Sequence, residues 1–184
     1  GSEYKDFKKT TEQIHSCMEL CDGYFTSTDT LGEEIRREFP GKPVVINRNC
    51  ASMEMQILSH DAVEQVEKDS EHISIGYFSG SKTHDQDFEV AEEALLEVMK
   101  EHSEVRLKLV GVLSDRKMEK FGNKVEKLPF MDWKQLPSVM AGIDINLMPL
   151  EDSIFHCSKS ENKWMEAALV KVPSVMSRNR EMEG

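Results

Sequence analysis

Short apolar segments alternate with amphipathic helical segments along most of the chain, and this alternation limits the possible folds more than any other feature. In residues 87–99, Phe88, Ala91, Leu95 and Val98 recur at helical spacing, and glutamates occupy the opposite face. Strands that alternate with helices predict a parallel sheet with helices on both faces. We therefore expect an α/β fold, with a Rossmann-like parallel sheet flanked by helices. The expected strands are 73–78, 105–112, 125–128, 143–148 and 172–176, and the expected helices are 52–68, 87–99, 134–141 and one that begins near Ser160.

The first fifty residues form a smaller pattern of their own. A helix is expected at 4–20, a strand at 23–28, a helix at 31–39 and a strand at 44–47. Thr30 and Glu33 have the spacing of a capping box for the second of these helices. We divide the chain at this point, with residues 1–50 as one part and 51–184 as the main domain.

Composition and charge restrict the possible partners. The formal net charge of −11 argues against a nucleic-acid-binding surface. No apolar run approaches the roughly 18 residues of a membrane span. The four cysteines form no CxxC pair, so we expect buried free thiols, a cytoplasmic location and no metal site. The chain begins with Gly-Ser in place of Met, and we interpret it as a piece of a longer protein.

Two lysines stand near the start of the last expected helix. Ser158 and Glu161 have the spacing of a capping box, and Lys159 and Lys163 fall in or near the first turn. Cations are unfavourable at this end of a helix because its unpaired N–H groups already carry positive charge. A bound anion reverses this effect, and phosphate binds well at helix N-termini. We therefore predict an anion site here, with the Ser160 hydroxyl as a further hydrogen-bonding group.

A second candidate loop follows the expected strand 73–78. It contains Gly80 and Lys82, and ligands of parallel sheets bind at the carboxyl ends of strands. Residues 76–83 also fit the phosphate-loop pattern G-x-x-x-x-G-K-[ST], except that Ser81 replaces the second glycine. A surface loop in which Thr83 and Gln86 cap the following helix is a third interpretation of the same residues.

The stretch around Met165-Glu166-Ala167 resembles the donor-binding half of GT-B glycosyltransferases. In that family a helix after the fourth strand of the C-terminal domain receives the diphosphate of a nucleotide-sugar, and a glutamate further along the helix holds the ribose. Glu166 matches that glutamate, and Ser158 stands where the family has the first glutamate of its usual pair. Gly76 and Lys82 have the family's spacing between a strand-end glycine and a diphosphate-binding lysine, with Tyr77 in place of the common arginine.

The resemblance implies a function and a set of binding residues. It implies a transferase that moves a sugar from a nucleoside diphosphate sugar to a saccharide or other glycan acceptor, with no metal or other cofactor. Phe130 lies in the segment that contacts the base in the family, whereas Trp164 is expected in the core. Residues 1–50 would be the end of the N-terminal domain, and the donor domain is expected to be cut short and inactive alone. The expected donor-binding residues are Gly80, Lys82, Phe130, Lys159, Ser160, Lys163 and Glu166.

Two other functions remain open on the sequence. The phosphate-loop pattern at 76–83 would suit a phosphotransferase or NTPase that uses Mg²⁺. An α/β domain that binds partners without catalysis would need none of these residues. The sugar, the base and the acceptor are not determined by the sequence.

Overall fold

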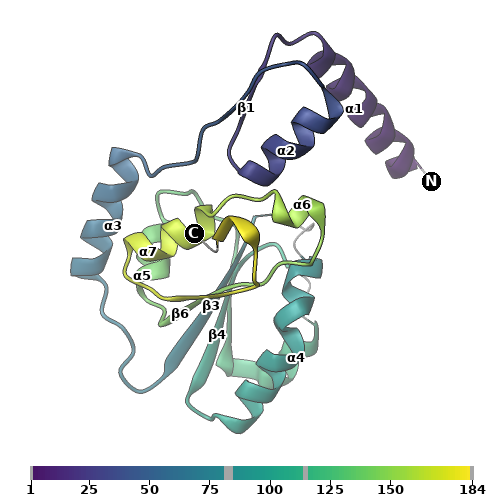
Figure 1. Cartoon of the computed structure of the whole chain (residues 1–184). Helices are drawn as coiled ribbons and strands as arrows, with labels where there is room; N and C mark the ends of the chain where they lie inside the picture. Colours follow the sequence, from purple (N-terminus) through teal and green to yellow (C-terminus); the bar gives the residue numbers. More distant parts are fainter. Residues whose placement is uncertain (1, 81–84, 114–115, 183–184) are drawn as a thin grey trace.

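A five-stranded parallel sheet forms the centre of the molecule in the computed structural model, which describes residues 2–80, 85–113 and 116–182 (Figure 1). The strands lie in the order β5-β4-β3-β6-β7, so the order of connection reverses between β3 and β6. In sheets of this kind, ligands bind at the carboxyl ends of the strands beside that reversal. The strands are β3 (Ile73–Ser79), β4 (Val105–Gly111), β5 (Val125–Leu128), β6 (Ile145–Met148) and β7 (Ser174–Met176).

Helices cover both faces of this sheet. The helix α4 (Asp85–Glu101) and the 3₁₀ segment η2 (Arg116–Lys124) pack on one face, where Tyr77, Phe88 and Met118 are fully buried. The helices α3 (Met53–Gln65), α5 (Leu136–Ala141) and α7 (Asn162–Leu169) cover the other face, and Figure 1 shows α3 and α4 on opposite sides of the sheet. This architecture confirms the expected α/β fold. The sequence patterns missed η2, the short helix α6 (Ile154–Cys157) and the 3₁₀ turn η3 (Arg180–Met182).

Gly76 lies in the middle of β3, where it pairs with Lys108 of β4 and Asn146 of β6. A Cβ atom at this position would collide with the side chain of Ile143, so the close approach of β3 to that residue requires glycine. The first four residues of the phosphate-loop pattern are therefore part of a central strand. A phosphate loop needs this stretch to wrap an anion with its N–H groups, which argues against the phosphotransferase interpretation.

The first fifty residues form a separate two-stranded parallel sheet (Figure 1). It consists of β1 (Tyr24–Thr26) and β2 (Val44–Ile46), with α2 (Asp29–Glu38) between them and α1 (Ser2–Glu19) before them. The expected capping box at Thr30 is wrong. Instead, Thr28 caps α2 by accepting a hydrogen bond from the Leu31 N–H at 3.2 Å, because the helix begins two residues earlier than the pattern indicated.

The segment 177–182, which follows β7, returns to this smaller part. The Glu181 carboxylate accepts hydrogen bonds from the Thr30 N–H at 2.8 Å, the Thr30 hydroxyl at 2.6 Å and the Asp29 N–H at 3.2 Å. It thus binds the N-terminus of α2, where a negative charge is favourable. Arg180 adds a two-pronged ion pair with Glu33, in which both distances are 2.9 Å. The segment 177–182 therefore ties α2 to the main sheet.

All four cysteines are free thiols, as expected, but the expectation of burial is wrong for three of them. Cys17, Cys21 and Cys50 are exposed, and Cys157 is partly buried. Cys17 is exposed because almost every described side chain of α1 faces solvent. No helix within the described ranges is long and apolar enough to cross a membrane.

Candidate functional site

A cavity of about 440 Å³ lies at the carboxyl ends of β3 and β4, beside the start of α7. Four residues predicted from the sequence line it together: Gly80, Phe130, Lys163 and Glu166. They come from three separate parts of the chain, and the sheet brings them to one edge. The remaining lining residues are Phe78, Ser79, Val110, Gly111, Met131, Asp132, Trp133, Leu136 and Asn162. Lys82, the other lysine expected here, lies outside the described residues.

Lys163 is the second residue of α7, so its ammonium group sits close to the positive end of the helix. Its Nζ lies 5.4 Å from the centroid of the Tyr77 ring. Burial lowers the pKa of this ammonium group, against the opposing effect of the Asp87 carboxylate. The ammonium group has no hydrogen bond or ion pair with any described residue. A half-buried cation at a helix N-terminus is a strong site for an anionic ligand.

Glu166 lies almost one turn further along α7 and is partly buried at the cavity wall. Burial raises the pKa of its carboxyl group, and the nearby charge of Lys163 opposes that shift. Its oxygens have no hydrogen-bond donor within the described part of the chain. A carboxylate in this position can accept hydrogen bonds from ligand hydroxyl groups.

The floor of the cavity depends on a glycine that the sequence patterns missed. Gly111 ends β4 with φ of 99°, and a Cβ atom there would overlap the carbonyl oxygen of Ser79. The ends of β3 and β4 can approach this closely only with glycine at that position. The Ser79 hydroxyl then donates a hydrogen bond to the Val112 carbonyl at 2.7 Å, which joins the two strand ends below the cavity.

Aromatic side chains form the outer wall of the cavity. Phe130 is 67% exposed and Trp133 is 40% exposed, although both are large apolar residues. Their loop is fixed by Asp132, whose carboxylate accepts a hydrogen bond from the Lys134 N–H at 2.9 Å. Lys134 also pairs with Glu54 of α3 at 2.6 Å. The result is an open apolar wall that suits a flat ligand ring.

A second cavity, of about 450 Å³, adjoins the first and shares Asn162 and Lys163 with it. Lys159 and Ser160 line this second cavity. Neither has an unpaired polar group, because Lys159 Nζ lies 2.9 Å from a carboxylate oxygen of Asp87, and Ser160 Oγ accepts a hydrogen bond from the Asn49 side chain at 2.8 Å. Its other lining residues are Ser27, Met148, Pro149, Leu150, Phe155 and Ser158.

The start of α7 differs from the expected capping box. Glu161 is the N-cap residue and makes no side-chain cap bond, whereas the Ser158 hydroxyl donates to the Ile154 carbonyl at 2.8 Å at the end of α6. The pattern failed because Ser158 is the C-cap residue of the preceding helix α6. Trp164 is 46% exposed, so the expectation that it belongs to the core is also wrong.

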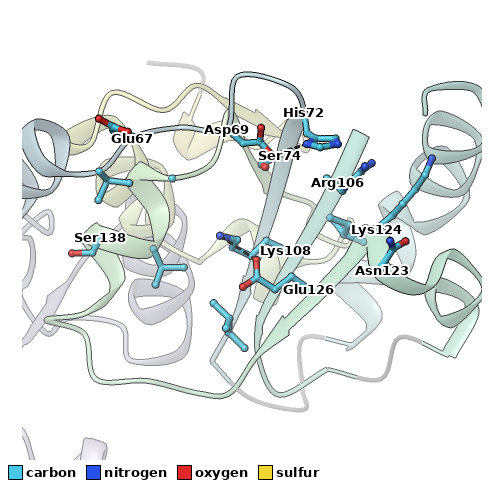
Figure 2. Close-up of a pocket in the computed structure, with 15 residues that line it drawn as sticks. Glu67, Asp69, His72, Ser74, Arg106, Lys108, Asn123, Lys124, Glu126 and Ser138 are labelled. Carbon is cyan, nitrogen blue, oxygen red and sulfur yellow. Dashed lines mark hydrogen bonds and ion pairs between the residues drawn. The ribbon is translucent and has the colours of Figure 1, made fainter. Parts of the chain in front are cut away.

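A third cavity, of about 620 Å³, lies at the amino end of the sheet and is shown in Figure 2. Most of its charged side chains have partners among the described residues. His72 bonds to Asp69 at 2.6 Å, Arg106 Nη1 donates to the Ser103 carbonyl at 2.8 Å, and Lys108 pairs with Glu126 at 3.3 Å. These pairs leave less free charge for a ligand than Lys163 does, so the first cavity is the better candidate site.

No cluster of three or more His, Cys, Asp or Glu side chains with metal-binding geometry occurs within residues 2–80, 85–113 and 116–182. The described residues therefore suggest no metal ligand set beside Lys163 or Glu166.

Comparison with known proteins identifies the fold. No protein-family model matches the chain, and neither does any curated protein sequence. Among solved structures, the chain is similar to WaaG, a glycosyltransferase involved in lipopolysaccharide biosynthesis, with a TM-score of 0.62 and 15% identity over 86% of this chain. A weaker similarity, with a TM-score of 0.47 and 14% identity over 73% of this chain, links it to the trehalose-6-phosphate synthase OtsA.

The chain spans less than half of these proteins, 45% of WaaG and 36% of OtsA. The similarity to WaaG confirms the expected GT-B-like fold for this chain.

Proposed function

We propose that this chain is the donor-binding part of a GT-B glycosyltransferase, which moves a sugar from a nucleoside diphosphate sugar to a saccharide or other glycan acceptor. The observation that carries the proposal is the placement of Lys163 and Glu166 in one cavity, each without a hydrogen-bonding partner among the described residues. A cation and a carboxylate on the same helix would recognise the two halves of a nucleotide, phosphate and ribose.

The order of groups in the cavity supports one orientation of the ligand. The diphosphate would bind Lys163 and the N–H groups at the start of α7. The ribose hydroxyls would donate to Glu166, and the base would lie against the apolar wall formed by Phe130 and Trp133. At Gly80 an added Cβ atom would meet no described atom within 4 Å, and the bare glycine backbone would be free to approach the phosphates.

The transferred sugar would then occupy the second cavity. That cavity begins at Asn162 and Lys163, where the diphosphate would end, and it reaches Ser27 of the smaller part. The acceptor and a general base would come mainly from the rest of the protein, so this chain alone should turn over poorly.

Catalysis by this part would be electrostatic. When the bond between the sugar and the diphosphate breaks, negative charge grows on the leaving oxygen, and Lys163 would stabilise it more strongly in the transition state than in the ground state. The N-terminus of α7 adds partial positive charge in the same place. We propose that these groups replace a metal ion, and that Lys82 contributes a second cation.

The test is nucleotide binding in the presence of EDTA. UDP or GDP should bind by calorimetry or NMR without Mg²⁺, and the affinity should fall with added salt. Lys163→Met should lower the affinity for the diphosphate by about ten- to a hundredfold, the usual effect of losing a charged hydrogen bond. Lys100→Met, which removes an exposed lysine from α4, is the matched control and should change little. Binding only of a nucleoside triphosphate with Mg²⁺ would favour a phosphotransferase, and no binding at all would favour a noncatalytic interaction domain.

A further inference from the structure

The side chain of Asp87 is a buried carboxylate close to the candidate site. Asp87 is the third residue of α4, and its side chain is 1% exposed. Three donors that hold it come from the segment between β6 and α7. Lys159 Nζ lies 2.9 Å from one carboxylate oxygen, and the other accepts from His156 Nε2 at 3.0 Å and the Glu151 N–H at 3.2 Å.

His156 extends this network into the segment itself. Its ring is almost fully buried, and Nδ1 lies 2.7 Å from the Ser153 hydroxyl, which also caps α6. Both ring nitrogens are therefore engaged, as fits an imidazole that donates from Nε2 to Asp87 and accepts at Nδ1 from Ser153. The His156 carbonyl accepts from the Asn179 side chain at 3.1 Å. The segment 151–159 is thus fixed at several points, and three of these contacts are with Asp87.

The network also gives the two lysines different charge partners. Asp87 neutralises Lys159, whereas Lys163, four residues later, keeps an unpaired ammonium group among the described residues. Only three residues separate Lys159 from Lys163, so any movement of the segment 151–159 shifts the start of α7 and with it the Lys163 side chain.

We propose that Asp87 is a positioning residue of the ligand site. It holds the segment 151–159 against α4 and thereby orients Lys163 and the first N–H groups of α7 toward the phosphates. The proposal rests on the proposed function for the identity of the ligand, but the effect of Asp87 on the segment 151–159 can be measured without a ligand. Asp87 does not contact the ligand; it acts through Lys159 and His156.

The effect of Asp87→Asn on diphosphate affinity distinguishes a positioning role from a purely electrostatic one, because the two roles predict changes of opposite sign. Asp87→Asn removes a negative charge close to the phosphate site, and electrostatics alone would then strengthen anion binding. Under the positioning proposal the same variant weakens it, because Lys159 loses its partner and the start of α7 becomes mobile. The two explanations therefore predict opposite changes in affinity.

The experiment compares UDP, GDP and UMP binding to wild type, Asp87→Asn, Lys159→Met and the double variant by calorimetry. We expect Asp87→Asn to weaken binding of the better diphosphate by about tenfold, with a much smaller change for UMP, which lacks the second phosphate. Adding Asp87→Asn to Lys159→Met should lower the affinity much less than Asp87→Asn does in wild type, because the two residues act as one unit. Glu89→Gln, an exposed carboxylate two residues along α4, is the matched control.

Hydrogen exchange supplies the second measurement, which needs no ligand. In Asp87→Asn the amides of residues 151–163 should exchange about tenfold faster, while those of β3 and β4 keep their protection. If Asp87→Asn does not fold, Lys159→Met should still raise exchange at residues 157–163. Tighter diphosphate binding by Asp87→Asn, or unchanged exchange in residues 151–163, would overturn the proposal. If wild type binds neither UDP nor GDP, the proposed function fails, and hydrogen exchange still decides the role of Asp87.

Discussion

The proposed contact between Glu166 and the ribose can be tested by the substitution Glu166→Gln, which keeps the shape of the side chain and removes its charge. A hydrogen bond to a charged group contributes about 1.5–3 kcal/mol and one between neutral groups about 0.5–1.5 kcal/mol. Because two ribose hydroxyls would share the carboxylate of wild type, the expected loss is about 1.5–3 kcal/mol, or roughly ten- to a hundredfold in Kd.

The assay compares UDP with 2′,3′-dideoxy-UDP on both proteins, or the two guanosine forms if GDP binds better. Wild type should prefer the ribose form strongly, and Glu166→Gln should keep only the small preference that a neutral hydrogen bond provides. Glu97→Gln, an exposed carboxylate on α4, is the control for loss of one negative charge. Calorimetry of all four combinations forms a cycle that isolates the contact between the hydroxyls and the carboxylate.

The pH dependence gives an independent check on the same residue. Burial raises the pKa of the Glu166 carboxyl group, so this group takes up its proton at a higher pH than an ordinary glutamate. The preference for ribose should therefore fade as the pH falls through that raised pKa, whereas Glu166→Gln should show no such change. Equal preference for ribose in the two proteins at neutral pH would show that Glu166 is a solvated helix residue and remove it from the site.

Two further predictions concern stability. Gly111→Ala should lower the free energy of unfolding by about 2–4 kcal/mol in urea, because a Cβ would overlap the Ser79 carbonyl at a positive φ; Gly142→Ala, which meets only ordinary contacts, should change it little. Burial of Glu181 opposes the hydrogen bonds from Thr30 and Asp29, but the net effect lowers the pKa of its carboxyl group. The stabilisation from the charged Glu181 carboxylate is therefore present above the unfolded pKa of about 4.3 and lost as the pH falls through the lower folded pKa. Wild type should lose its advantage in unfolding free energy over Glu181→Gln as the pH falls below that unfolded value.

The sequence predicted the main elements because strands such as β3 and β6 are short segments rich in apolar residues, and the long helix α4 has a clear apolar face. Phe88 and Leu95 are an example, since both are buried against the sheet as their spacing predicted. Lys163 and Glu166 were identifiable because they share one helix, and local spacing is enough to place them side by side.

Contacts between distant parts of the chain were not predictable in this way. Asp87 and Lys159 are 72 residues apart, and nothing in the spacing of either one indicates the ion pair. The capping boxes failed for a related reason. Thr30 and Ser158 have suitable neighbours at short range, but Thr30 is engaged by Glu181 and Ser158 by α6. Gly111 was missed because the need for glycine arises only when β3 and β4 lie next to each other.

The segment 177–182 has a mechanical consequence. Glu181 binds the Asp29 N–H and Arg180 pairs with Glu33, so the start of α2 and residues 180–181 are joined by side-chain contacts as well as by the long chain between them. If the chain is pulled from a residue before α2 and a residue after Glu181, the force acts first on these short polar contacts. The parallel sheet lies in the part of the chain between the two contact points, and it would carry no tension until the contacts broke. When the molecule is stretched in an optical trap, it should extend in two steps. The first and smaller extension occurs when the contacts between residues 180–181 and α2 break, and the second and larger one when the sheet unfolds.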